Sequence, residues 1–109
     1  MTVYHKNLAS GGWRKLSFGK KMANIGSEVE RAINWKSKNK HYADLAIERF
    51  LELIDLTIRD ETEFHRLREL LRIRELFLDY ILGNNQYFFS ADFWKKYFYQ
   101  FTYAAQANK

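Results

Sequence analysis

The chain of 109 residues contains neither cysteine nor proline. Without cysteine there is no disulfide framework, no thiolate nucleophile and no sulfur-ligated zinc site. A lack of cysteine fits a reducing compartment, so we expect a cytoplasmic protein. Without proline, helices can continue through many turns without a break.

Long hydrophobic runs are also missing. No stretch approaches the roughly 18 uncharged apolar residues that a transmembrane helix requires. The first residues, from Met1 to Lys6, lack the apolar segment of a secretory signal peptide. We therefore expect a soluble protein with no membrane partner. The length fits one compact domain, in which a deep catalytic pocket would compete with the core for stability.

Short chemical motifs are absent as well. The sequence has no Gly-x-Ser-x-Gly turn, no phosphate-binding glycine loop and no Glu-x-x-His pair of the kind that helical bundles use for metals. Its histidines, His5, His41 and His65, are far apart along the chain. The sequence therefore predicts no catalytic residues, no metal site and no cofactor.

Charge and aromatic residues are unevenly distributed. Residues 1–40 carry nine basic and two acidic side chains, whereas residues 41–109 carry nine basic and eleven acidic ones. Ten of the nineteen aromatic residues lie between Tyr87 and Tyr103. One end of the chain is therefore basic and the other is aromatic, so an argument for nucleic-acid binding depends on the first 40 residues.

Apolar residues recur with helical spacing from residue 16 onward, and this pattern predicts helices. The expected helices span residues 18–38, 40–59, 61–82 and 91–106. Ser17, Asp60 and Ser90 are the expected N-caps, and Asp60 with Glu63 has the pattern of a capping box. Gly83 is expected to end the third helix.

Short turns between these helices place neighbours antiparallel. The sequence therefore predicts an all-α fold, an up-down-up-down four-helix bundle that forms a single domain over residues 16–109. Residues 1–15 contain Gly11 and Gly12 and are expected to form a loose, flexible N-terminal arm.

Two glycines, Gly19 and Gly26, flank the apolar stripe of the first expected helix. Glycine inside a helix costs about 1 kcal/mol relative to alanine. Their presence indicates either a close approach by a neighbouring helix or a less well-formed first turn.

Arg74 falls in the middle of the apolar arc of the third expected helix. An unpaired buried charge would cost several kcal/mol. We therefore expect Arg74 to meet a carboxylate such as Glu28 or Glu30, or to lie in a hydrated interface with another protein.

The opposite side of the same helix is charged. Its charged residues recur every three or four positions, and they are His65, Arg68, Arg72, Glu75 and Asp79. This spacing predicts a solvated face with intrahelical ion pairs. The carboxylates weaken the alternative that this face binds anions.

Arg59 and His65 are separated by five residues, a spacing that resembles the R-x(4-6)-H motif of the HEPN family of small helical nucleases and nucleotide-binding partners. The resemblance implies that Arg59 and His65 would form an RNA-cleaving pair in a dimer. The polar residue that usually follows the arginine of the family is the acidic Asp60 here.

The fourth expected helix carries Lys96, Tyr99 and Tyr103 on the side away from its apolar stripe. Exposed tyrosines beside lysine can anchor a protein partner or stack on bases. Because they recur at three and four residues, these side chains are candidates for an interface.

Four sequence segments together resemble a family of short bacterial and archaeal helical proteins that has no established activity. They are Met22–Val29, Leu53–Thr57, Arg68–Glu75 and Asp79–Tyr80. The resemblance covers about residues 16–105 and implies a self-contained helical domain. It also makes Glu28, Arg74 and Asp79 a set to inspect for mutual contacts.

From the sequence we hypothesise a non-enzymatic protein that acts by protein–protein association as a homodimer. The residues expected at that interface are Arg74, Lys96, Tyr99 and Tyr103. The alternative is a module that binds RNA or DNA through the basic N-terminal third, by way of Arg14, Lys15, Lys20 and Lys21. A second alternative is a ribonuclease similar to the HEPN enzymes.

Overall fold

A computed structural model describes residues 11–107 of the chain, with side chains described through residue 104. Within this part, four α-helices form an all-α four-helix bundle, which confirms the predicted fold class. A short 3-10 helix, η2 (Trp13–Lys15), precedes α1 (Phe18–Trp35), α2 (Lys40–Asp60), α3 (Phe64–Leu82) and α4 (Ala91–Ala107).

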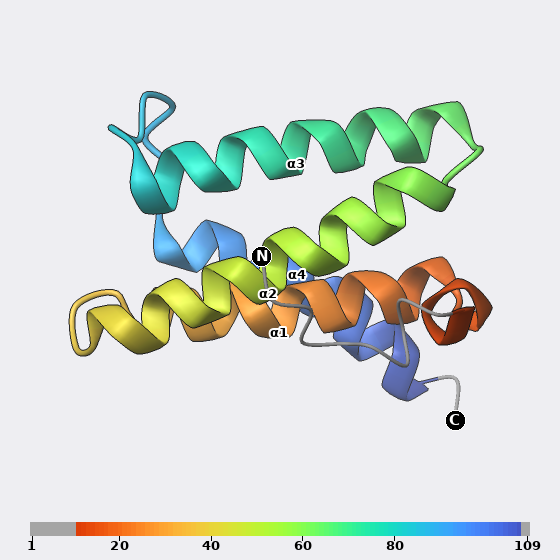
Figure 1. Ribbon diagram of the computed structural model, residues 1–109, viewed down its shortest axis with the longest axis horizontal. Helices are drawn as coiled ribbons and strands as arrows, with labels where there is room; N and C mark the ends of the chain where they lie inside the picture. Colours follow the sequence, from red (N-terminus) through yellow and green to blue (C-terminus); the bar gives the residue numbers. More distant parts are fainter. Residues whose placement is uncertain (1–10, 108–109) are drawn as a thin grey trace.

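Successive helices alternate in direction (Figure 1). Among the described residues, α1 packs closely against both α2 and α4, whereas α3 packs closely against α2 alone. The backbones of α3 and α4 stay further apart, and long side chains connect them. This uneven packing leaves a groove between α3 and α4.

The helices bury a core that is rich in aromatic side chains. Phe50 of α2 lies 4.8 Å from Phe77 of α3 between ring centroids, and Phe77 lies 5.3 Å from Trp94 of α4. All three side chains are buried. Large rings supply much buried apolar area in a small domain, so this series of contacts holds α3 to both of its neighbours.

Gly26 lies at a close contact between α1 and α4. A Cβ atom added at this position would lie 2.6 Å from Cβ of Phe98. The prediction that a helical glycine permits a close approach is therefore confirmed at Gly26. At Gly19 an added Cβ would meet no atom within 4 Å.

Trp13 belongs to the core. Its side chain is 1% exposed, and its indole Nε1 donates a hydrogen bond of 2.9 Å to Oγ1 of Thr57 in α2. The expectation of a loose arm over residues 1–15 is therefore wrong for Trp13–Lys15, because burial of the indole holds this segment on α2. Residues 1–10 of that expected arm lie outside the described residues.

The N-cap of α3 is Glu63, not Asp60 as the sequence predicts. The Glu63 carboxylate accepts hydrogen bonds from the backbone amides of Arg66 at 2.7 Å and His65 at 3.1 Å. These amides hold the pKa of Glu63 below its usual value. α3 accordingly begins at Phe64.

The first helix is shorter than predicted. α1 ends at Trp35, whose carbonyl oxygen accepts from the amides of Lys38 at 2.9 Å and Asn39 at 2.8 Å. The side chain of Asn39 then caps α2 by accepting from the amide of Tyr42 at 3.1 Å. Residues 36–39 therefore form the turn between these helices.

The other two predicted caps are confirmed. Oγ of Ser17 accepts from the amide of Lys20 at 3.2 Å, and Oγ of Ser90 accepts from the amide of Phe93 at 3.0 Å. Within residues 11–107, no helix combines the length and the apolar composition required to cross a bilayer.

Candidate binding groove between α3 and α4

An open groove of about 440 Å³ lies between α3 and α4. Side chains from both helices line it, and they are His65, Arg68, Glu69, Arg72, Ile73, Leu76, Phe93, Trp94 and Tyr97. We call this feature the α3–α4 groove. Its volume is within the range of small-ligand sites.

The α3 wall of the groove is cationic. His65, Arg68 and Arg72 follow one another at three and four residues, so they share one side of the helix. Within residues 11–107, Arg68 and Arg72 form no ion pair. Both arginine side chains are exposed, so their guanidinium groups are accessible to an anion.

The α4 wall is aromatic. Phe93 stacks on Tyr97 with ring centroids 6.4 Å apart and meets Trp94 edge to face at 5.2 Å. Trp94 is buried, whereas Phe93 is 42% exposed and offers part of its ring to a ligand. The cationic wall of α3 therefore faces an aromatic wall on α4.

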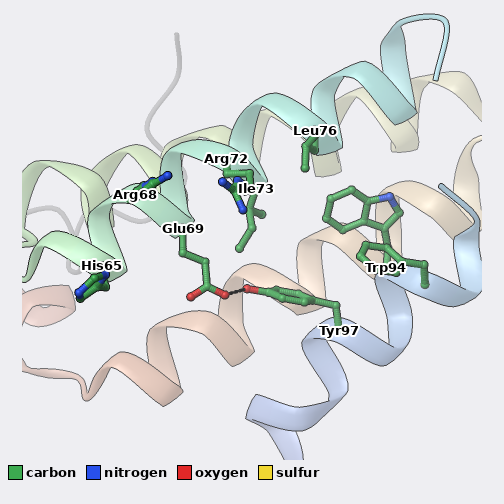
Figure 2. Close-up of a pocket in the computed structure, with 9 residues that line it drawn as sticks. His65, Arg68, Glu69, Arg72, Ile73, Leu76, Trp94 and Tyr97 are labelled. Carbon is green, nitrogen blue, oxygen red and sulfur yellow. Dashed lines mark hydrogen bonds between the residues drawn. The ribbon is translucent and has the colours of Figure 1, made fainter. Parts of the chain in front are cut away.

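Glu69 and Tyr97 connect the two walls. The Tyr97 hydroxyl donates a hydrogen bond to the Glu69 carboxylate, as Figure 2 shows. Burial first, and then this hydrogen bond, raise the pKa of Tyr97 far above its usual value. The phenol therefore stays protonated at neutral pH, and the carboxylate of Glu69 is already engaged by a donor.

Trp94 presents carbon atoms to the groove. Its Nε1 is buried without a hydrogen-bond partner among the described atoms. Figure 2 shows this nitrogen on the side of the ring away from Glu69, with the six-membered part of the indole turned toward the groove. The indole consequently contributes an apolar surface at this end of the site.

A second hollow of about 450 Å³ adjoins the groove and shares part of its lining. It is lined by Arg68, Leu71, Arg72, Glu75, Leu76, Tyr87 and Phe89, and we call it the Tyr87 hollow. Arg68 and Arg72 line both spaces. Phe89 of the hollow stacks on Phe93 of the groove with ring centroids 4.5 Å apart, so the aromatic linings of the two spaces are continuous.

The turn before α4 positions these aromatic residues. Asn85 donates through Nδ2 to the carbonyl of Phe89 at 2.8 Å and accepts through Oδ1 from its amide at 3.0 Å. Asn85 and Phe88 have positive φ angles of 49° and 55°. Asparagine tolerates this conformation, whereas phenylalanine rarely adopts it, so the backbone is strained at Phe88.

The ion pairs predicted along α3 are not formed. Within residues 11–107, Arg68 and Arg72 pair with neither Glu75 nor Asp79. Asp79 instead accepts from the amide of Gln86 at 2.8 Å and fixes the turn after α3. The Asp79 carboxylate is thus engaged by the backbone, while the carboxylates that line the two spaces with the arginines are Glu69 and Glu75.

Arg74 pairs with Asp55 of α2, not with Glu28 or Glu30 as the sequence predicts. Its Nε donates to Oδ1 of Asp55 at 2.7 Å and its Nη2 to Oδ2 at 3.4 Å. Both side chains are partly exposed. The pair accounts for the charge at this position within one chain, which weakens the expectation that Arg74 lies in an interface.

The set of Glu28, Arg74 and Asp79 has no mutual contacts among the described hydrogen bonds. Glu28 is buried in α1, where one carboxylate oxygen accepts from Arg31. Its other oxygen, Oε2, is buried without a hydrogen-bond partner. Since Arg74 pairs with Asp55, each member of the set has a different local role.

The other expected interface residues lie on the outer side of α4. Tyr99 and Tyr103 are 64% and 61% exposed, and their ring centroids are 6.3 Å apart. Lys96 pairs with Asp92 one turn earlier, at 3.1 Å. We call Tyr99 and Tyr103 the tyrosine pair. None of these residues lines the α3–α4 groove.

The basic residues of the N-terminal third are spread over η2 and the start of α1. Arg14 pairs with Asp60 at 3.2 Å, while Lys15 and Lys20 are exposed and Lys21 is partly buried. Arg14 therefore has a partner within the chain, and the lysines are accessible.

Arg59 and His65 have different surroundings. Nε of Arg59 lies 3.4 Å from Oδ1 of Asp60, the carboxylate that also receives Arg14. Hydrogen bonds from Arg14 and then from Arg59 lower the pKa of Asp60. His65 lines the α3–α4 groove, and Arg59 is not among its lining residues. In the described part of the chain, no cluster of three or more His, Asp or Glu side chains could hold a metal ion.

Sequence reasoning did not identify the groove as a site. The helical pattern places Phe93, Trp94 and Tyr97 on the apolar side of α4, which is where core residues are expected. The spacing of Arg68 and Arg72 predicts a solvated face. These arginines and the aromatic residues of α4 line one groove because the backbones of α3 and α4 stay apart, which the sequence pattern does not indicate.

Comparisons of the chain with protein-family models, curated proteins and solved structures give no match.

Proposed function

We propose that this is a non-catalytic binding protein whose functional surface is the α3–α4 groove. The observation that carries the proposal is that Arg68 and Arg72, which form no ion pair with any described residue, face an aromatic wall across an accessible space. We propose the cytoplasm as its compartment, because the chain has no cysteine.

The two walls select a ligand with two chemical properties. A guanidinium group binds carboxylate or phosphate through charge-assisted hydrogen bonds. The exposed part of Phe93 and the ring of Tyr97 favour a flat apolar group. A ligand that carries both an anionic group and an aromatic ring satisfies both walls at once.

Titration of the isotope-labelled protein with anilinonaphthalene sulfonate, which is both anionic and aromatic, tests this proposal. We expect amide chemical shifts to change along Arg68–Leu76 and Phe93–Tyr97. The double variant Arg68→Gln/Arg72→Gln should bind the probe about tenfold more weakly, because it loses two charged donors. Its circular dichroism should match that of the parent.

The matched control is Lys38→Gln/Lys40→Gln, which removes the same charge at positions that do not line the groove. This variant should bind the probe like the parent. Equal weakening by both double variants would show that net charge alone attracts the probe. That outcome, or shift changes outside the two segments, would overturn the groove as the functional surface.

A second candidate function is self-association through the tyrosine pair. It is favoured by the high exposure of two adjacent aromatic rings on the outer side of α4. Exposed tyrosines are enriched in protein interfaces because they are amphipathic and lose little conformational entropy. Sedimentation equilibrium at tens of micromolar should then show a dimer that Tyr99→Ser/Tyr103→Ser converts to a monomer. A monomeric parent would remove this candidate.

A further inference from the structure

We infer that the ligand of the α3–α4 groove and the Tyr87 hollow is a single-stranded nucleic acid. Its phosphates would lie along Arg68 and Arg72, and its bases would lie against the aromatic side chains that line the two spaces. This inference rests on the function proposed above and names the ligand class of the same site.

Two arginines follow the axis of α3. Arg68 and Arg72 are about 6 Å apart along it, and His65 lies about 4.5 Å before Arg68. On another side of α3, the guanidinium carbon of Arg66 lies 4.8 Å from the ring centroid of Phe18 in α1. Proteins that bind single strands combine a positively charged track with aromatic side chains.

Arg66 connects α3 to the basic start of α1. Its contact with Phe18 places the N-terminal turn of α3 beside the first turn of α1, where Lys20 is exposed. The basic start of α1 therefore lies beside the first turn of α3, while α4 and the turn before it supply the aromatic part of the site.

The two spaces that share the arginine pair have one continuous aromatic lining, because Phe89 stacks on Phe93 at 4.5 Å between ring centroids. Phe93 and Tyr97 lie in the α3–α4 groove, while Tyr87 and Phe89 lie in the Tyr87 hollow. Each space has the volume of a small-ligand site, and the two share both arginines. A ligand that fills both spaces is a polyanion with more than one flat ring.

A single strand fits this arrangement better than a duplex or an acidic peptide. The bases of a duplex are stacked on one another, so their faces cannot reach Phe93 or Tyr87 without melting. An acidic peptide would neutralise the arginines but would leave most of the aromatic surface without a matching group. Of these three ligands, only a single strand has phosphates for the arginines and unstacked bases for the aromatic wall.

Fluorescence anisotropy with labelled oligonucleotides of about 12 residues tests the inference. The probes are oligo(U), oligo(dT), a DNA duplex of equal length and polyglutamate. We expect binding of one or both single strands that weakens steeply between about 50 and 200 mM salt, because phosphate contacts release counterions. The two single-stranded probes show whether RNA or DNA is preferred.

Variants separate the two contributions. Arg68→Gln/Arg72→Gln should weaken binding at least tenfold and reduce the slope of log affinity against log salt by about 1.4, since each phosphate contact contributes about 0.7 for a single strand. Phe93→Leu keeps an apolar side chain but removes a stacking surface, so it should weaken binding by about 5- to 100-fold with the salt slope unchanged. Lys38→Gln/Lys40→Gln is the control of equal charge.

Several outcomes would overturn the inference. They are equal or tighter binding of the duplex, binding of polyglutamate that Phe93→Leu does not alter, and no binding of either single strand at low salt. If anilinonaphthalene sulfonate still binds the groove in these cases, the proposed function stands and only the ligand class is wrong. If neither the sulfonate nor any oligonucleotide binds, both proposals fail.

Discussion

The indole nitrogen of Trp13 donates a hydrogen bond to the hydroxyl of Thr57, which lies 44 positions further along the chain. The hydroxyl in turn donates to the carbonyl of Leu53, one turn earlier in α2, at 2.8 Å. Both side chains are buried. One threonine thus satisfies a buried donor of the segment before α1 and a carbonyl of α2.

Replacing Thr57 by valine should lower the free energy of unfolding by about 1–3 kcal/mol. The variant keeps the shape of the side chain but leaves Nε1 of Trp13 buried without an acceptor, and an unmade buried hydrogen bond costs this amount. Urea denaturation followed by circular dichroism measures the change. Thr62→Val, at an exposed position between α2 and α3, is the control and should stay within about 0.5 kcal/mol of the parent.

Adding one methyl group at each of two glycines should have opposite effects. Gly26→Ala should destabilise the protein by about 1–3 kcal/mol, because the new Cβ would collide with Phe98 and push α4 from α1. Gly19→Ala meets open space and should stabilise by up to about 1 kcal/mol through helix propensity. Thermal or urea unfolding of both variants checks the pair. A neutral Gly26→Ala would contradict the close packing of α1 and α4.

Stability should decrease at alkaline pH through Tyr97. Because burial and the hydrogen bond to Glu69 raise the pKa of this phenol in the folded state, folding favours its protonated form. Its contribution is complete below the unfolded pKa of about 10 and is lost as the pH rises above that value. The urea midpoint of Tyr97→Phe should therefore fall less between about pH 8 and pH 11 than that of the parent.

Tyr99→Phe removes a hydroxyl outside the groove and serves as the control for this comparison. An identical alkaline decline in the parent and in Tyr97→Phe would show that the bond between Tyr97 and Glu69 does not contribute to the pH dependence.

Phe88→Gly should leave the free energy of unfolding unchanged or raise it by about 1 kcal/mol. Phe88 is 89% exposed and has a positive φ angle, so glycine relieves backbone strain and gives up little packing. Phe89→Gly, at the neighbouring partly buried position, should destabilise the protein. A large loss of stability in Phe88→Gly would mean that the exposed ring has a packing partner. Denaturant midpoints for the two variants decide this.

The helices were predictable because each one has a clear amphipathic repeat, and Arg74 was recognisable as a charge that needs a partner. The identity of that partner was not predictable. The pattern placed Asp55 on the solvent side of α2, and only the packing angle of α3 on α2 brings it within 2.7 Å of Arg74. The apolar period indicates on which side of its helix a residue lies. It does not indicate how two helices are oriented when they pack.

Trp13 and the groove were missed for related reasons. Gly11 and Gly12 suggested a loose arm, yet a single indole buries enough apolar area to hold a short segment in place. Gly26 permits the close contact of α4 with α1, whereas the backbones of α3 and α4 stay further apart in the described part of the chain. No local pattern in either helix specifies that separation.

The uneven support of α3 has a consequence for hydrogen exchange. Among the described helices, only α2 packs its backbone closely against α3, so opening of α3 disrupts fewer contacts than unfolding of the whole bundle. We therefore expect the amides of α3, the helix that carries Arg68 and Arg72, to exchange through a local opening that has a lower free energy than global unfolding. A ligand held between α3 and α4 would couple this helix to the rest of the molecule, so occupancy of the groove would be measurable as protection of the α3 amides.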